Sequence, residues 1–117
     1  MAAKKTQAKV KSNIIHTSGK RKRAVARSTL RPGTGKVRFN HVELNMIEPE
    51  FARLRLQEPL LIAGDAARQI DIDVTAVGGG WAGQIEAARL AIGKALAQYG
   101  GEELKKTLLE YDRHLLV

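Results

Sequence analysis

The chain has 117 residues, of which 44% are hydrophobic, and it contains no cysteine; this fits one globular domain and excludes disulfides and thiolate metal sites. It carries 20 Lys and Arg against 12 Asp and Glu, a net charge of +8. No stretch approaches the roughly 20 apolar residues of a membrane span, and residues 1–12 lack the apolar core of a secretory signal, so we expect a cytoplasmic protein.

The positive charge is concentrated at the start of the chain. The first 40 residues hold twelve Lys and Arg and no acid, which leaves eight bases and twelve acids for the remainder. Cations that meet phosphates release condensed counterions and strengthen binding. Nucleic acid is therefore the expected partner class; an anionic membrane surface would require a basic amphipathic helix, and this segment does not have that pattern.

The N-terminal third predicts an arm and a hairpin. Residues 1–13 are polar and basic without an apolar period, and we interpret them as a flexible arm ahead of a single globular domain, residues 14–117. Residues 14–17 predict a short edge strand. Residues 22–30 and 36–39 predict a β-hairpin closed by the loop 32–35, whose Pro, Gly and Thr residues suit a tight turn.

The register of this hairpin separates charged from apolar side chains. If Arg31 faces Lys36, then Leu30 faces Val37, and alternation gives one basic face and one apolar face. A solvated charged face is the simpler interpretation, but like charges without an acid nearby favour contact with RNA or DNA. The predicted RNA-binding residues are Lys20, Arg21, Lys22, Arg23, Arg27, Arg31, Lys36 and Arg38.

The middle of the chain predicts two short helical pieces and a strand. A helix is expected to open at residues 48–50, where Pro and acids suit a first turn, and Pro59 is expected to separate it from a second piece near 64–68. Residues 70–77 alternate between apolar and polar positions and predict a strand with one buried face.

A glycine run leads into the C-terminal helices. Gly78, Gly79 and Gly80 end the strand, residues 81–99 have helical periodicity, the glycines at 100–101 stop that helix, and residues 102–111 form a last one. The positions predicted to pack are Trp81, Ile85, Ala88, Ile92, Ala95, Leu96, Tyr99, Leu104 and Leu108.

Residues 78–96, GGGWAGQIEAARLAIGKAL, closely resemble a motif of the small-subunit ribosomal protein nine family. The motif is long and its spacing is fixed. Three more stretches agree with the family: 19–27, 32–40 and 58–65. The last residues, 111–117, look like the archaeal and eukaryotic branch of the family.

The resemblance implies an α+β fold with a mostly antiparallel four-stranded sheet backed by helices, of the type named after the second domain of ribosomal protein five. It also implies a left-handed βαβ crossover, against the usual preference. The expected role is structural, on the ribosome, with small-subunit ribosomal RNA and neighbouring small-subunit ribosomal proteins as partners and without catalysis, cofactor or metal.

One departure concerns transfer RNA. Family members continue past the position of Val117 into a basic tail that ends near the peptidyl-site transfer RNA, whereas this sequence stops there. The tail is either truncated or lost, so we expect no residue of this chain to make that contact.

Alternatives remain at individual sites. The loop Gly78 to Gly80 could serve close packing, RNA phosphate contact or, as in small-molecule kinases of related fold, a nucleotide. Asp71 and Asp73 share a strand face and are expected to be solvated or ion-paired rather than catalytic or bound to Mg²⁺. Three scattered histidines and the group 112–114 give no metal or catalytic pattern, and Trp81, Tyr99 and Tyr111 are expected to pack rather than to stack on bases.

Two functions outside the ribosome use the same features. A free-standing nucleic-acid chaperone or DNA-binding module would use the same cations, and selectivity for folded ribosomal RNA distinguishes it. A small kinase-like enzyme would bind ATP at the glycine loop, which an ATP titration tests.

Overall fold

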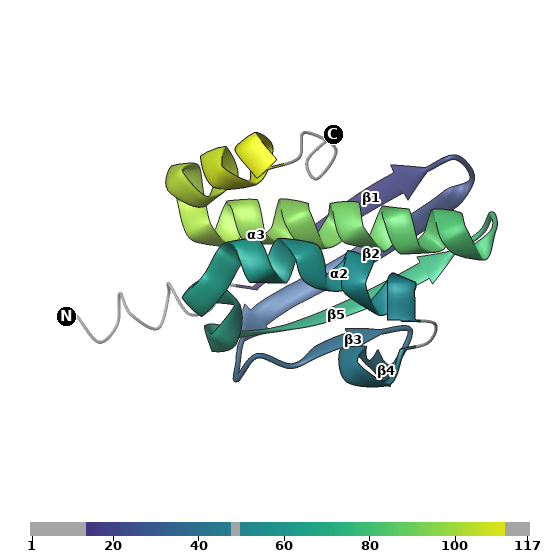
Figure 1. The fold of residues 1–117 in the computed structure, drawn as a ribbon, viewed down its shortest axis with the longest axis horizontal. Coiled ribbons are helices and arrows are strands. Elements are labelled where there is room, and N and C mark those ends of the chain that lie inside the picture. Colours follow the sequence, from purple (N-terminus) through teal and green to yellow (C-terminus); the bar gives the residue numbers. More distant parts are fainter. Residues whose placement is uncertain (1–13, 48–49, 112–117) are drawn as a thin grey trace.

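A computed structural model of the chain describes residues 14–47 and 50–111. A twisted sheet forms one layer and the helices form a second layer on one of its faces (Figure 1). The elements in chain order are β1 (Ile15–Arg21), β2 (Ala24–Pro32), β3 (Val37–Phe39), β4 (Val42–Glu43), η1 (Leu44–Met46), α2 (Glu50–Ala63), η2 (Gly64–Gln69), β5 (Ile70–Val77) and α3 (Trp81–Tyr111). The arm expected at residues 1–13 lies outside the described residues, as does the helix start at residues 48–49.

The sheet has five strands in the order β1-β2-β5-β3-β4 and is antiparallel except for the pair β3 and β5. It is therefore mostly antiparallel, as expected, with the two-residue β4 as an additional edge strand. The connection from β3 through α2 to β5 crosses the helical side of the sheet, and Figure 1 shows that this crossover is left-handed.

The predicted hairpin between residues 22–30 and 36–39 is wrong, because β5 lies between these two strands. The lateral alignment nevertheless matches the predicted one: Leu30 and Val37 are both register partners of Ile72, so they lie in one row with Ile72 between them. Because β5 is inserted without shifting β2 and β3 relative to each other, the predicted basic face and apolar face are both retained. The side chains predicted for the apolar face are buried: Ala24, Ala26, Leu30, Val37 and Phe39.

The hairpin that does form joins β1 to β2 through a turn at Lys22 and Arg23. The edge strand predicted at residues 14–17 is thus longer and runs to Arg21. Gly19 faces the helical layer, and a Cβ there would lie 2.4 Å from the carbonyl oxygen of Ala87 in α3. The absent side chain lets β1 lie directly against this helix.

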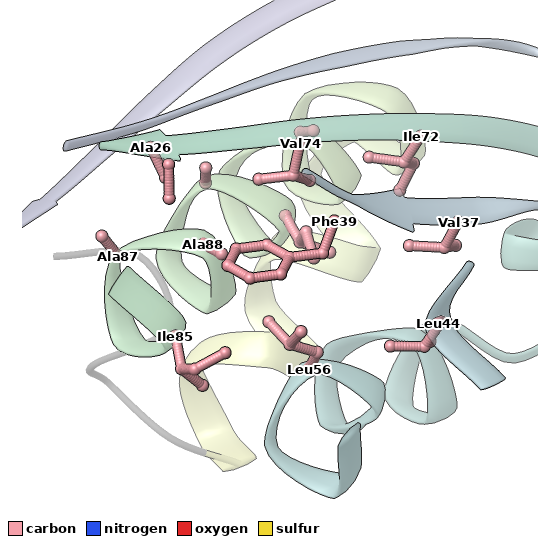
Figure 2. Packing of buried hydrophobic residues seen from close by; sticks show 14 of the residues in the cluster. Ala26, Val37, Phe39, Leu44, Leu56, Ile72, Val74, Ile85, Ala87 and Ala88 are labelled. Carbon is pink, nitrogen blue, oxygen red and sulfur yellow. The ribbon is translucent and has the colours of Figure 1, made fainter. Parts of the chain in front are cut away.

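The core lies between the sheet and the two long helices. Figure 2 shows Ile72 and Val74 of β5 facing Ala88 of α3 and Leu56 of α2 across it. Ile85, Ile92, Ala95, Leu96 and Leu108 are buried as the periodicity predicts. Trp81 is the exception, because 43% of it remains exposed at the first turn of α3.

Pro59 does not separate two helices, contrary to the prediction, since α2 runs through it to Ala63. Pro59 lacks the N–H that would bond the carbonyl of Arg55. Its side chain is fully buried, and tertiary packing outweighs that lost bond. The short helical piece predicted near 64–68 is present as η2.

Ion pairs hold α2 against α3. Arg89 is 2% exposed and donates from Nε to Oε1 of Glu58 over 2.8 Å. Arg55 donates from Nε and Nη2 to the two carboxylate oxygens of Glu86, both over 2.9 Å. These contacts fix the angle between the helices. Further along α3, Gly101 has a φ of 77° and breaks the helix where the glycine pair predicts a stop.

Candidate nucleic-acid interface

The face of the sheet opposite the helices carries most of the predicted cations. Alternation along β2 turns Arg27 and Arg31 outward, and Arg38 of β3 and Lys20 of β1 share this face. Lys36, Lys22 and Arg23 are exposed in the adjoining loop and turn, while Arg21 is half-buried. The described structure thus brings seven of the eight predicted residues to this face and its ends, whereas Arg21 has the phase of Gly19 and lies on the helical side of β1.

The expectation that no acid lies near these cations is wrong. Because β5 is inserted between β2 and β3, its outward residues Asp71 and Asp73 stand between the basic strands. Asp73 aligns with Thr29 on one side and with Arg38 on the other, and it pairs with Arg31. Glu43 of β4 lies opposite Arg38. The interface is a basic surface interrupted by three carboxylates.

Asp73 is ion-paired, as expected, and Asp71 binds backbone N–H groups of a neighbouring loop. Oδ1 of Asp71 accepts the N–H groups of Thr34 and Lys36, each over 3.0 Å, and so holds the loop that leads into β3. The N–H of Lys36 is the main cause that lowers the pKa of Asp71 below its ordinary 3.8, with help from the N–H of Thr34, while burial opposes it.

Asp71, Asp73 and three cations line one hollow of about 260 Å³ on this face. The cations are Arg31, Lys36 and Arg38. Its lining is strongly polar, and the positive groups outnumber the negative ones. A phosphate or another anionic group fits such a lining better than a neutral ligand does.

The glycine loop lies against the basic turn between β1 and β2. Gly78 and Gly79 have φ values of 80° and 60°, and a Cβ would lie 2.6 Å from the Arg23 oxygen at Gly78 and 2.9 Å from the Ala24 nitrogen at Gly79. Backbone conformation and close packing therefore both require glycine at these two positions. Gly80 has open space around its α-carbon, and its carbonyl accepts the N–H of Gln84 over 3.0 Å.

Other chemistry finds little support in residues 14–47 and 50–111. They contain no group of three or more His, Asp or Glu side chains able to hold a metal ion. No helix among them is long and apolar enough to cross a bilayer. His114 and the group 112–114 lie outside the described residues, as does the side chain of Tyr111.

Sequence reasoning missed two features of this surface. The partnership of Arg31 with Asp73 depends on strand order, although the shared outward phase of Asp71 and Asp73 was visible in the alternation of residues 70–77. The second is an exposed aromatic contact at the helical end: the rings of Phe51 and Trp81 meet edge to face with centroids 5.8 Å apart.

Known proteins resemble this chain over most of its length. Residues 19–117 match the family model described as ribosomal protein S9/S16. The small ribosomal subunit protein uS9 of Methanococcus maripaludis strain C5 is 45% identical over 105 residues, which cover 89% of this chain and 78% of that protein. The protein of the same name from Methanococcus vannielii is 46% identical over an alignment of the same length and coverage.

Proposed function

The chain belongs to the ribosomal protein S9/S16 family, and from this premise we propose how it acts as a structural constituent of the small ribosomal subunit. It binds and organises small-subunit ribosomal RNA through the open sheet face and the turn at residues 20–23. The family is not an enzyme family, and the proposal gives the chain no catalytic step and no cofactor. Its place is on the ribosome in the cytoplasm.

One observation carries the proposal: the cations gather on the side of the sheet that no helix covers (Figure 1). Seven basic residues at this face and its ends stand against three carboxylates. The opposite face is filled by the apolar core. A surface that is open, broad and positive suits the phosphate-lined, shallow minor groove of an RNA helix, which is recognised mainly by shape.

Different parts of the chain have different roles in this function. Residues 14–117 act as a single globular RNA-binding domain, and the basic arm 1–13 adds phosphate contacts. The glycine loop contributes close packing, and Gly80 is the position with room for a phosphate beside it. Contact with peptidyl-site transfer RNA belongs to residues that follow position 117 in family members, so none of the residues 14–111 receives that role. Neighbouring small-subunit proteins complete the set of partners.

Replacing Arg27, Arg31, Lys36 and Arg38 together with Gln tests the interface. For the parent we expect a log-log salt slope of roughly −4 to −7, and the variant should lose about 3 of this, since each phosphate contact contributes about 0.7 to 0.9. The assay is binding to an archaeal small-subunit ribosomal RNA fragment between about 50 and 300 mM KCl. Circular dichroism should stay the same, because all four side chains are exposed.

A matched control replaces Lys105 and Lys106, two exposed cations on the last turns of α3, with Gln. This control should keep the parent slope. A loss of slope in the control about half that of the fourfold variant, in proportion to the two charges removed, would show that net charge, and not this face, governs binding. Binding that does not distinguish folded ribosomal RNA from duplex DNA would instead favour a general nucleic-acid-binding protein.

A further inference from the structure

A second surface of the molecule is apolar. We define the apolar patch as Val42, Met46, Phe51, Leu54 and Trp81, which are 43% to 70% exposed. These residues come from β4, η1, the first turns of α2 and the start of α3. Exposed apolar groups are normal when scattered, but a contiguous group that includes the single Trp of the chain marks an interaction site.

Contacts within the structure show that the patch is contiguous. Val42, Met46 and Trp81 line one hollow of about 290 Å³ together with Phe39, Asn40 and Ile47. Trp81 also meets the ring of Phe51 edge to face. Leu54 follows Phe51 by three residues on α2 and therefore covers the adjacent surface.

The hollow is built to receive a side chain. Phe39 and Ile47 are buried and belong to the main core, so they give it a fixed floor. Met46, which is 70% exposed, stands at its rim. Met and aromatic side chains are enriched in the centres of protein interfaces, where they surround an anchoring residue of the partner.

The local charge argues against RNA as the occupant. None of the six residues that line the hollow is charged. Residues 41–52, which carry three of the five patch residues, contain three Glu and no Lys or Arg. The first base after them, Arg53, pairs with Glu50 at 3.7 Å. Phosphates would find no cation in this segment, whereas a basic protein would find Glu50, which directly precedes Phe51 of the apolar patch.

We propose that the apolar patch is the docking surface for a neighbouring basic protein, which inserts an apolar side chain between Met46 and Trp81 and places Lys or Arg near Glu50. This inference rests on the proposed function, because a particle of RNA and protein supplies such a neighbour. The chain then joins two partner classes: RNA on the open sheet face and protein at the apolar patch.

Site-specific photocrosslinking in assembled subunits tests this. Small subunits of Methanococcus maripaludis are reconstituted from their RNA and purified proteins, with this full chain replacing the resident relative. One variant carries Met46→p-benzoylphenylalanine. The matched control carries Thr75→p-benzoylphenylalanine, an exposed position beside Arg27 on the open sheet face. We expect the probe at position 46 to link to protein and the probe at position 75 to link to RNA.

The linked peptide is identified by mass spectrometry. A peptide with an apolar residue at the link and Lys or Arg close by supports the proposal. A link from position 46 to RNA, or no protein link in particles that contain the chain, overturns it. A probe at position 75 that fails to reach RNA contradicts the proposed RNA interface and leaves the result at position 46 to be judged separately.

A charge substitution gives a second, independent measurement. Met46→Asp should reduce incorporation about tenfold in competition with the parent chain, which is the scale of an interface residue whose loss costs more than about 1 kcal/mol. Its affinity for protein-free ribosomal RNA should stay within about twofold of the parent, since the open sheet face is untouched. Unchanged incorporation by this variant would overturn the proposal. A circular dichroism melt confirms that it folds, as expected for so exposed a position.

Discussion

Neutralising Asp73 should strengthen RNA binding, although acidic residues at an interface are often taken as specific contacts. Asp73 pairs with Arg31 and aligns with Arg38 on the neighbouring strand. An Arg held by a carboxylate is less available to a phosphate, and the carboxylate itself repels the RNA backbone. Asp73→Asn removes both effects and keeps the size of the side chain.

The expected gain follows from counterion release. If Arg31 gains one phosphate contact, the log-log salt slope should steepen by about 0.7 to 0.9, which corresponds to a roughly five- to eightfold higher affinity at 0.1 M salt. The fold should barely respond. The side chains of Arg31 and Asp73 are 52% and 41% exposed, and such a solvated pair contributes about 0 to 1 kcal/mol.

Fluorescence anisotropy with labelled ribosomal RNA from about 50 to 300 mM KCl measures the slope, and thermal melts follow the fold. Glu110→Gln serves as the control, because it makes the same change in net charge at the far end of α3 and should leave the slope unchanged. A lower affinity of the Asp73→Asn variant with an intact fold would refute the reasoning. It would mean that the carboxylate contacts RNA directly, for example a ribose hydroxyl or a base amino group.

Three further predictions concern stability. The pKa of Asp71 is lowered in the folded state, so its carboxylate stabilises the protein above pH 3.8, and this stabilisation is lost as the pH falls through the folded pKa. In the Asp71→Asn variant the melting temperature should therefore fall less over this acidic range than it does in the parent. Gly79→Val should cost at least about 1 to 2 kcal/mol in a urea melt, because φ is 60° there and the new side chain would contact Ala24. The fraction that still folds should keep the RNA affinity of the parent. Gly80→Val is the control, because this position has open space around it; it should cost less stability than Gly79→Val, and an equal cost would contradict the role of close packing. Arg89→Ala should cost roughly 1 to 3 kcal/mol in the same assay, because Glu58 loses a charge-assisted hydrogen bond to a buried arginine but keeps its pair with Arg55 at 3.2 Å. A loss below about 0.5 kcal/mol would show that water replaces the arginine.

Local pattern was enough for the faces of the strands and for the charged surface. Alternation along residues 24–39 assigned Leu30 and Val37 to the core and Arg27, Arg31 and Arg38 to the outside, and the burial agrees. This succeeded because side-chain direction in a strand depends only on its own backbone. The break at Gly101 was equally local, since a glycine with positive φ ends a helix whatever lies around it.

Strand order and the exceptions to local rules required the tertiary structure. β5 follows β3 by some thirty residues, yet it lies between β2 and β3, where its apolar face packs in the core against the helices and both its edges are paired. That placement brought Asp71 and Asp73 among the cations. Burial likewise carried α2 through Pro59 and left Trp81 exposed at the end of the helical layer. A chain therefore determines by local geometry which way each side chain points, whereas the neighbours that it meets are decided by the free energy of burying all apolar faces at once.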